Sequence, residues 1–285
     1  MKLPASPPRS VRRIMGLVLL ALLPGTLAQA WLLDGSLAAR AALAVGFALA
    51  SEAALLCLRR RPLRPFLTDL SAPITGVLLA LLLPPATPWW ITGTGAVIAL
   101  VLAKQLYGGL GDNLFNPAMV GYAALLLLFP AQVAAVFGGP PSQAGASLAT
   151  GGLFALGGLF LLWRRLIPWQ TPLAMVLGAL LASAALRHAS GTPDAAAFAA
   201  PLSVAVVLAA FFVVTDPVTG CLSPRGRLLF GLGTGVLTSL LAPGPGSADG
   251  LPFAVLLMNC LAPWIDHHTR PARPPSAVPA TDAPA

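Results

Sequence analysis

Three carboxylates lie within or beside long apolar segments, and they are the residues best placed to do chemistry. They are Glu52, Asp69 and Asp216. A charge inside a membrane is costly, so such residues commonly mark ion or proton pathways. Asp69 and Asp216 each lie close before a Pro-Ile/Val-Thr-Gly string, and these strings contain Thr75 and Thr219. One interpretation of the pattern is a cation or proton pathway that uses the carboxylates and two helices broken at these strings.

The same carboxylates also have a purely structural interpretation. Asp69 and Asp216 would each cap the N-terminus of a half-helix, where a carboxylate accepts otherwise unpaired amides. Glu52 would extend its side chain toward the arginines at 59–61. The sequence leaves both interpretations open.

The remaining polar residues exclude several other kinds of site. Cys57, Cys221 and Cys260 are isolated and form no CxxC or Cys/His pattern, so we expect neither a metal site nor a disulfide framework. The net charge is +8, but the basic residues are scattered between apolar segments and form no stripe. A nucleic-acid partner is therefore not expected.

The segments that must position the carboxylates are those of a membrane protein. Hydrophobic residues make up 57% of the chain and charged residues 9%, whereas soluble proteins have about 25% charged residues. Several apolar segments are short or contain Pro and Gly, so we expect broken helices that face protein or a cavity. Ten spans fit, at about 13–33, 37–58, 68–84, 89–103, 115–130, 148–163, 171–187, 197–214, 228–242 and 251–265.

The basic residues predict the orientation of these spans. With the N-terminus inside, fifteen of the seventeen Lys and Arg residues fall on the cytoplasmic side, and only Arg40 and Arg187 fall outside. Both termini are then cytoplasmic, in a bacterial inner membrane. The chain divides into a cytoplasmic N-terminus at 1–12, a transmembrane domain at 13–266 and a Pro- and Ala-rich tail at 267–285, which we expect to be disordered.

A faint internal repeat bears on the fold. Pro73–Gly76 recurs as Pro217–Gly220 at a shift of 144 residues, and Asn116 recurs as Asn259 at a shift of 143. With five spans in each half, the second copy would be upside down relative to the first. The alternative is a chance match in a Pro-rich chain. The predicted fold is thus an all-α polytopic membrane protein of about ten helices, arranged as two inverted five-helix repeats with broken helices.

The least lipid-like stretch of the first half begins at Lys104. Gly108, Gly109 and Gly111 permit a tight re-entrant turn, and Asn116 with Pro117 is typical of a helix start. No phosphate-binding glycine pattern is present.

This stretch resembles the signature of the RnfD/NqrB family, in which a Gly-Gly-Leu-Gly turn precedes Asn-Pro-Phe-Asn-Pro-Ala-Met-Val-Gly-Tyr. Leu114 replaces the first Pro of that signature. The similarity runs from about residue 16 to 271. Further matches follow in order, at Leu22 to Gly25, Asp69 with Ser71 and Thr75, Pro84-Pro85 with Pro88 to Trp90, Trp163 to Ile167, Thr215 to Val218, Gly226-Arg227, Phe253 to Asn259, Ala262-Pro263 and Asp266.

The resemblance implies the D-type component of an Rnf-type electron transport complex, which moves electrons between ferredoxin and NAD while translocating Na⁺ or H⁺. It also implies partner subunits of the A, B, C, E and G types, and a chain that is not an enzyme on its own. Family members of the D type carry FMN, esterified through its phosphate to a threonine. That threonine lies in a Ser-Gly-Ala-Thr motif, in the loop between spans five and six.

The flavin loop is where the sequence departs from the family. The loop from Ala131 to about Ala146 is short and lacks the motif; the nearest string is Ser147–Thr150, in which Leu148 replaces the glycine. Thr150 therefore fits a helix N-terminus better than a flavin anchor. Two hypotheses remain: a D-type subunit whose flavin is lost or held noncovalently, or a divergent, flavin-free paralogue that scaffolds other subunits or passes ions or a small solute.

Overall fold

The computed structural model describes residues 8–133, 144–190, 203–242 and 250–270, and the regular secondary structure in these ranges is entirely helical. Each of the ten predicted spans contains a helix. The helices are α1 (Pro8–Leu32), α2 (Leu37–Leu58), α3 (Leu63–Leu67), α4 (Ser71–Leu82), α5 (Trp89–Ile98), the π-helix η1 (Ala99–Gln105), α6 (Pro117–Leu128), α7 (Pro130–Val133), α8 (Ala144–Trp163), α9 (Gln170–Ser190), α10 (Val204–Phe212), α11 (Pro224–Leu240) and α12 (Gly250–Thr269).

Some helices are long and others are short, as expected if several membrane-spanning helices are broken. Among the described residues, five helical stretches are long and apolar enough to cross a membrane: Val11–Leu32, Leu37–Leu58, Leu63–Leu82, Gly145–Trp163 and Gln170–Ala189. By contrast, α10 has 9 residues and at about 1.5 Å per residue does not span the ~30 Å hydrocarbon core. The stretch Leu63–Leu82 is long enough only as a whole, because it consists of the short helices α3 and α4. The ends of the short helices therefore need polar partners from the protein itself.

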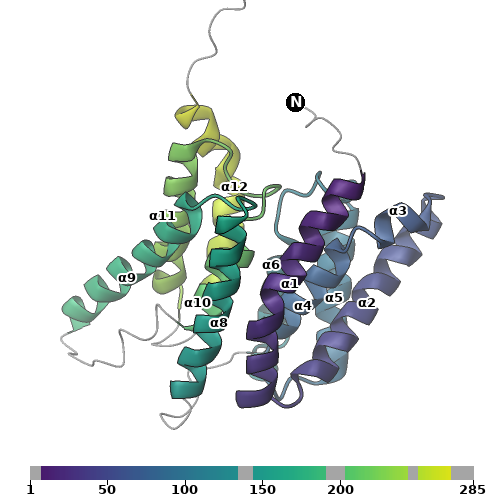
Figure 1. Cartoon of the computed structure of the whole chain (residues 1–285), viewed down its shortest axis with the longest axis horizontal. Coiled ribbons are helices and arrows are strands. Elements are labelled where there is room, and N and C mark those ends of the chain that lie inside the picture. Colours follow the sequence, from purple (N-terminus) through teal and green to yellow (C-terminus); the bar gives the residue numbers. More distant parts are fainter. Residues whose placement is uncertain (1–7, 134–143, 191–202, 243–249, 271–285) are drawn as a thin grey trace, which may run out of the picture.

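The helices form two groups that lie side by side. In Figure 1, α1 to α6 make up one group and α8 to α12 the other, with α1 against α8. The contact is close, because a Cβ at Gly157 of α8 would overlap the Ala21 carbonyl oxygen of α1. Helix starts recur between the groups at a fixed shift of 133 residues, from Leu37 to Gln170 and from Ser71 to Val204.

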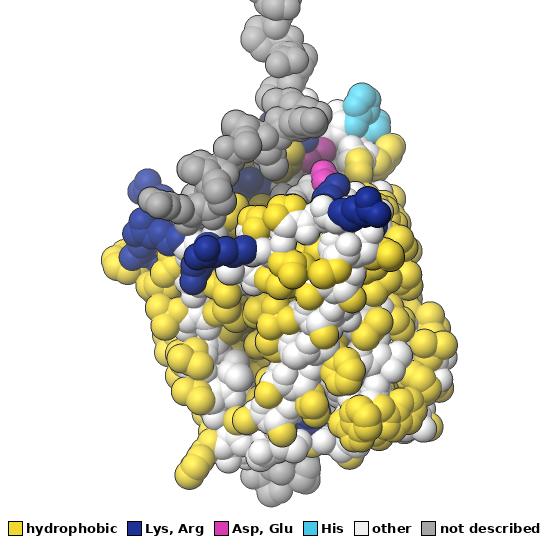
Figure 2. Space-filling view, turned by 90° about the vertical axis from the view of Figure 1, so that its right-hand side faces the viewer, with side chains coloured by type: hydrophobic (Ala, Val, Ile, Leu, Met, Phe, Trp, Pro, Cys, Tyr) yellow, Lys and Arg dark blue, Asp and Glu magenta, His cyan; other side chains and the backbone are white. Residues whose placement is uncertain are grey.

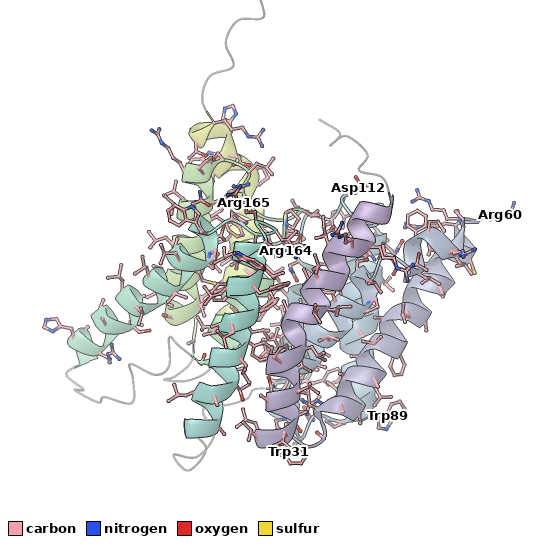
Figure 3. All side chains as sticks on the ribbon, viewed as in Figure 1. Trp31, Arg60, Trp89, Asp112, Arg164 and Arg165 are labelled. Atoms are coloured by element: carbon pink, nitrogen blue, oxygen red, sulfur yellow. The ribbon has the colours of Figure 1, made fainter. Side chains whose placement is uncertain are left out.

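The two groups also have opposite orientations. Trp31, near the end of α1, and Arg164, just after α8, lie toward opposite ends of the bundle in Figure 3. Equivalent helices therefore run in opposite directions, which is what an inverted repeat requires. The Pro/Thr/Gly strings do not follow the shift of the helix starts: the first lies in the opening turns of α4, and the second follows the end of α10.

Several charged residues lie at one end of the bundle. Figure 3 places Arg60, Asp112, Arg164 and Arg165 toward this end, and Trp31 toward the other. We call it the arginine-rich end. On the face shown in Figure 2, most Lys and Arg side chains lie near one end, above a surface rich in hydrophobic side chains. Arg60 of the first group of helices and Arg164 and Arg165 of the second thus lie at the same end, as the charge pattern predicted.

Candidate functional site

A cavity of about 130 Å³ lies between the two groups of helices, and we call it the central cavity. Apolar side chains from α1, α4, α8 and α10 form much of its wall. Of the described residues that line it, Lys104 and Asp216 are the only ionisable ones. Its other polar lining residues are Ser71, Thr75, Asn113, Asn116 and Thr215.

A buried ion pair adjoins this cavity. Lys104 Nζ lies 2.6 Å from Glu52 Oε1 and donates to Ser71 Oγ, also at 2.6 Å. Gln105 Nε2 donates to the same Glu52 oxygen at 2.8 Å. Glu52 is fully buried and Lys104 is 2% exposed. The interpretation that Glu52 reaches toward the arginines at 59–61 is therefore wrong. Lys104, which the charge pattern counted among the cytoplasmic residues, is buried against Glu52.

The π-helix η1 places this lysine. Lys104 and Gln105 are its last two residues, and both side chains are buried and bonded to Glu52 of α2. A π-helix is uncommon and frequently occurs at functional sites. Sequence reasoning missed the pair because its members are 52 residues apart. The available signal was the presence of opposite charges in two neighbouring apolar segments.

Asp69 organises the start of α4. Its Oδ1 accepts the Ser71 amide at 2.8 Å and the Ser71 hydroxyl at 2.5 Å, so it takes the capping role predicted for it. Leu70, between them, has a φ of 68°. A non-glycine residue in this left-handed region stores about 1–3 kcal/mol of strain and is typical of functional sites. One turn later, Thr75 Oγ1 donates to the Ser71 carbonyl at 3.0 Å.

Asp216 lies in the turn between α10 and α11 and does not cap a helix, contrary to the prediction. Its Oδ1 accepts the Val218 amide at 3.0 Å, and its Oδ2 accepts the Thr219 hydroxyl at 3.3 Å. The carboxylate thus stabilises its own turn at the edge of the central cavity. Thr219 is buried, as is Thr75.

Two asparagines connect the two groups of helices beside the turn that carries Asp216. The Asn116 amide donates to Asn259 Oδ1 at 3.1 Å, and Asn259 Nδ2 donates to the Thr219 carbonyl at 3.0 Å. The residues paired by the sequence repeat are therefore in direct contact. They fix the turn that carries Asp216 against α12 and the start of α6.

The glycine turn has the conformation expected of it. Gly108, Gly109 and Gly111 have φ values of 124°, 115° and 99°, which side chains rarely tolerate. Asn116 Oδ1 accepts the Met119 amide at 3.3 Å, and Pro117 occupies the first turn of α6. The predicted turn and helix start are both confirmed.

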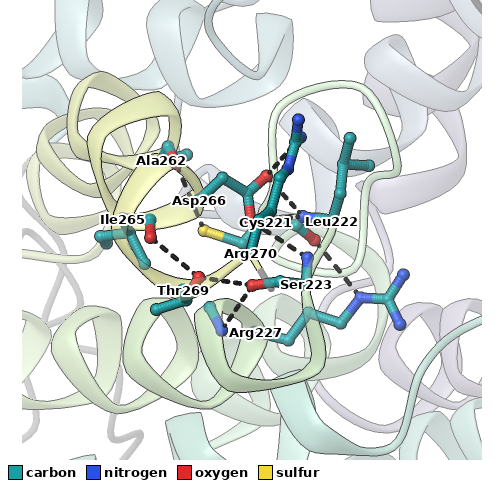
Figure 4. Close-up of polar contacts among 10 residues, drawn as sticks. Cys221, Leu222, Ser223, Arg227, Ala262, Ile265, Asp266, Thr269 and Arg270 are labelled. Atoms are coloured by element: carbon teal, nitrogen blue, oxygen red, sulfur yellow. Dashed lines mark hydrogen bonds and ion pairs between the residues drawn. The ribbon is translucent and has the colours of Figure 1, made fainter. Parts of the chain in front are cut away.

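A second polar cluster, drawn in Figure 4, fixes the start of α11. Asp266 accepts the Leu222 amide at 2.8 Å and the Ser223 amide at 3.0 Å, and pairs with Arg270 at 3.1 Å. Burial alone would raise the pKa of Asp266, but these hydrogen bonds outweigh it and lower the pKa. Burial, reinforced by the charge of Asp266, raises the pKa of the neighbouring Cys221 thiol to about 12.

Thr150 does not fit a phosphoester-linked flavin. It lies within α8, its side chain is fully buried, and its hydroxyl donates to the Ala146 carbonyl at 2.8 Å. An ester at this oxygen would require both the packing and the hydrogen bond to be broken. Residues 134–143 of the shortened loop are outside the described ranges. Within those ranges, no group of three or more His, Cys, Asp or Glu residues is arranged to hold a metal ion.

Comparison with known proteins identifies the family. The profile of the NQR2, RnfD, RnfE family matches residues 5–151 and 134–274. The chain belongs to this family. The first matched segment contains α1 to α7 and the second contains α8 to α12, and they overlap over 134–151, which includes the first residues of α8.

Relatives in this family are similar along nearly their whole length. The chain is 41% identical to the D-type component of the ion-translocating oxidoreductase complex of Ectopseudomonas mendocina, covering 91% of the chain and 90% of the relative. It is 42% identical to the protein of the same name from Pseudomonas aeruginosa, covering 90% of each, and 37% identical to that of Yersinia enterocolitica, covering 92% and 94%. The first alignment spans 316 positions against a chain of 285, so at least 31 positions face gaps in this chain.

Proposed function

We propose that this chain is the D-type membrane component of an Rnf-type ion-translocating oxidoreductase complex. In this role it couples electron transfer between ferredoxin and NAD to the movement of Na⁺ or H⁺, together with subunits of the A, B, C, E and G types. The observation that carries the proposal is the 37–42% identity to named D-type components over about nine tenths of both chains. The arginine-rich end would face the cytoplasm of a bacterium, with both termini on that side of the inner membrane.

The central cavity is the proposed ion pathway. It lies between inverted halves, where membrane transport sites are usually found. Lys104, Asp216, Ser71 and Thr75 line it. Glu52 bonds to Lys104, Thr219 bonds to Asp216, and Asp69 bonds to Ser71. Two carboxylates from the first half and one from the second would then carry the ion between the two sides.

We propose further that no flavin is esterified at Thr150. Its buried, hydrogen-bonded hydroxyl supports this. The FMN implied by the family would be lost or held noncovalently. The test is in-gel fluorescence of the denatured protein: a fluorescent band that Thr150→Ala abolishes would overturn the proposal, and a family member with the Ser-Gly-Ala-Thr motif serves as positive control.

The pathway is tested with inverted membrane vesicles that contain the assembled complex. Asp69→Asn and Asp216→Asn should each lower ion uptake driven by reduced ferredoxin and NAD, while the amount of assembled complex stays unchanged. Asp112→Asn is the matched control, because Asp112 is exposed and lies at the arginine-rich end outside the cavity lining. Normal uptake in both test variants would reduce the carboxylates to structural roles.

The competing hypothesis is a divergent paralogue that acts as a scaffold or a passive ion or solute channel. It predicts that the purified chain brings no redox partners with it and that vesicles take up ions without electron transfer. Affinity purification of the tagged chain, followed by identification of its partners, separates the two. Recovery of Rnf-like subunits in fixed proportion supports the D-type function.

A further inference from the structure

The Glu52–Lys104 pair has features that a purely structural ion pair would not need. Glu52 Oε1 accepts from both Lys104 and Gln105, whereas the fully buried Oε2 has no hydrogen-bond partner in the described structure. An unpartnered carboxylate oxygen in a buried site is costly. Oε2 of Glu52 is therefore free to bind a cation.

Lys104 can be reached from the central cavity, whereas Glu52 lies behind it. Lys104 lines the cavity and Glu52 does not. The ammonium has three donors, and the described structure uses two of them, toward Glu52 and Ser71. A cation in the cavity thus meets the lysine before it meets the carboxylate.

We propose that the Lys104 ammonium is a tethered cation that competes with the transported ion for Glu52. When Na⁺ or H⁺ binds the carboxylate, the still-protonated ammonium is displaced toward the cavity, where Asp216 is the only described carboxylate in the lining. Binding of Na⁺ changes no covalent bond, whereas binding of H⁺ forms an O–H bond on Glu52 with a proton that arrives through the cavity. With either ion the site and the displaced ammonium together gain one positive charge. This inference rests on the ion pathway proposed above.

The surrounding charges are consistent with such an exchange. The carboxylate of Glu52 is attracted by the charge of Lys104 and repelled by the charge of Asp69, which precedes α4. Arg59, at the end of α2, donates to the Gln105 carbonyl and so lies next to the pair. Two carboxylates and two nearby cations give a cluster close to neutral around Glu52, and it stays so when one monovalent ion takes the place of the ammonium. The added positive charge is then on the displaced ammonium, which faces Asp216 across the central cavity.

The test measures ion binding by the isolated full-length chain, which needs no partner subunits. The thermal unfolding midpoint of the protein in detergent is followed against Na⁺ at constant ionic strength, and separately against pH without Na⁺, since a bound ligand raises the midpoint. Lys104→Met should respond at a concentration of Na⁺ or H⁺ roughly tenfold lower than wild type. A competitor that leaves the site free about a tenth of the time weakens apparent affinity by that factor.

Two further variants test whether the response depends on Glu52. Glu52→Gln and the double variant Lys104→Met/Glu52→Gln both lack the carboxylate, so neither should show the response. If Lys104→Met folds only with Na⁺ or at low pH, while the double variant folds without either, the proposal is also supported. It is overturned if Lys104→Met responds no more strongly than wild type to either ion, or remains unfolded in all conditions while the double variant folds.

The two proposals fail in different ways. If Lys104→Met gains ion sensitivity but Asp69→Asn and Asp216→Asn pump normally, competition at Glu52 stands and the wider pathway is wrong. If those variants lose pumping but Lys104→Met gains no sensitivity, the pathway stands and the role of Lys104 is wrong.

Discussion

Arg40→Leu should be among the most destabilising single substitutions in this protein. Arg40 is 4% exposed, and its guanidinium lies 2.6 Å from Asp34 Oδ2. The same group donates to the Ala80 and Leu83 carbonyls at 3.2 Å each. These carbonyls lie at the C-terminus of the short helix α4, where the helix leaves acceptors unpaired and a cation is favourable.

The expected loss can be worked out from these contacts. Removing one partner of a buried ion pair costs about 3–5 kcal/mol, since the other charge remains unpaired. Each carbonyl left without a donor would add about 1–3 kcal/mol, but the terms overlap because one guanidinium serves all three acceptors. We therefore expect a loss of about 3–5 kcal/mol, a large part of the roughly 5–15 kcal/mol that stabilises a typical protein.

The assay is an unfolding titration with SDS in mixed micelles, followed by helical circular dichroism. The double variant Arg40→Leu/Asp34→Asn should recover part of the loss, because it removes the stranded charge. A cost below about 1 kcal/mol for Arg40→Leu would refute the estimate. A double variant as unstable as the single one would show that the lost helix cap, and not the stranded carboxylate, sets the cost.

Three further predictions concern the second half of the chain. Gly235→Ala should cost about 1–3 kcal/mol in the same titration, because its Cβ would overlap a backbone carbonyl oxygen of α9; Gly233→Ala, whose Cβ would meet a flexible methionine, should cost less. Asp266→Asn should destabilise the protein at neutral pH, and its difference from wild type should vanish as the pH falls through the lowered pKa of Asp266, below the ordinary value of 3.8. A difference that persists there would contradict the role of the ionised form. Cys221, with its pKa raised to about 12, should react with N-ethylmaleimide far more slowly than exposed Cys57 at the end of α2 at mildly alkaline pH, as counted by mass spectrometry; equal rates would contradict its burial.

Several parts of the candidate site could be predicted because they depend on local chemistry. The three glycines of the turn are needed wherever the backbone enters the left-handed region, and Asn116 before Pro117 is a local capping signal. Asp69 accepts an amide only two residues away. Asp216 was harder: the sequence shows a carboxylate before a proline, but not that α10 has already ended at Phe212.

Composition and charge in the sequence were enough to predict a helical membrane protein, the approximate positions of its ten spans, and an end where most of its arginines lie. Composition and charge decide these properties, because transfer into lipid depends on the content of each segment. Only the tertiary structure decided which buried charges pair: Lys104 with Glu52 across 52 residues, and Arg40 with the end of α4 across about 40. The reason is physical, since a buried charge must find a counter-charge or polar group in three dimensions, and that partner comes from whichever helix packs beside it.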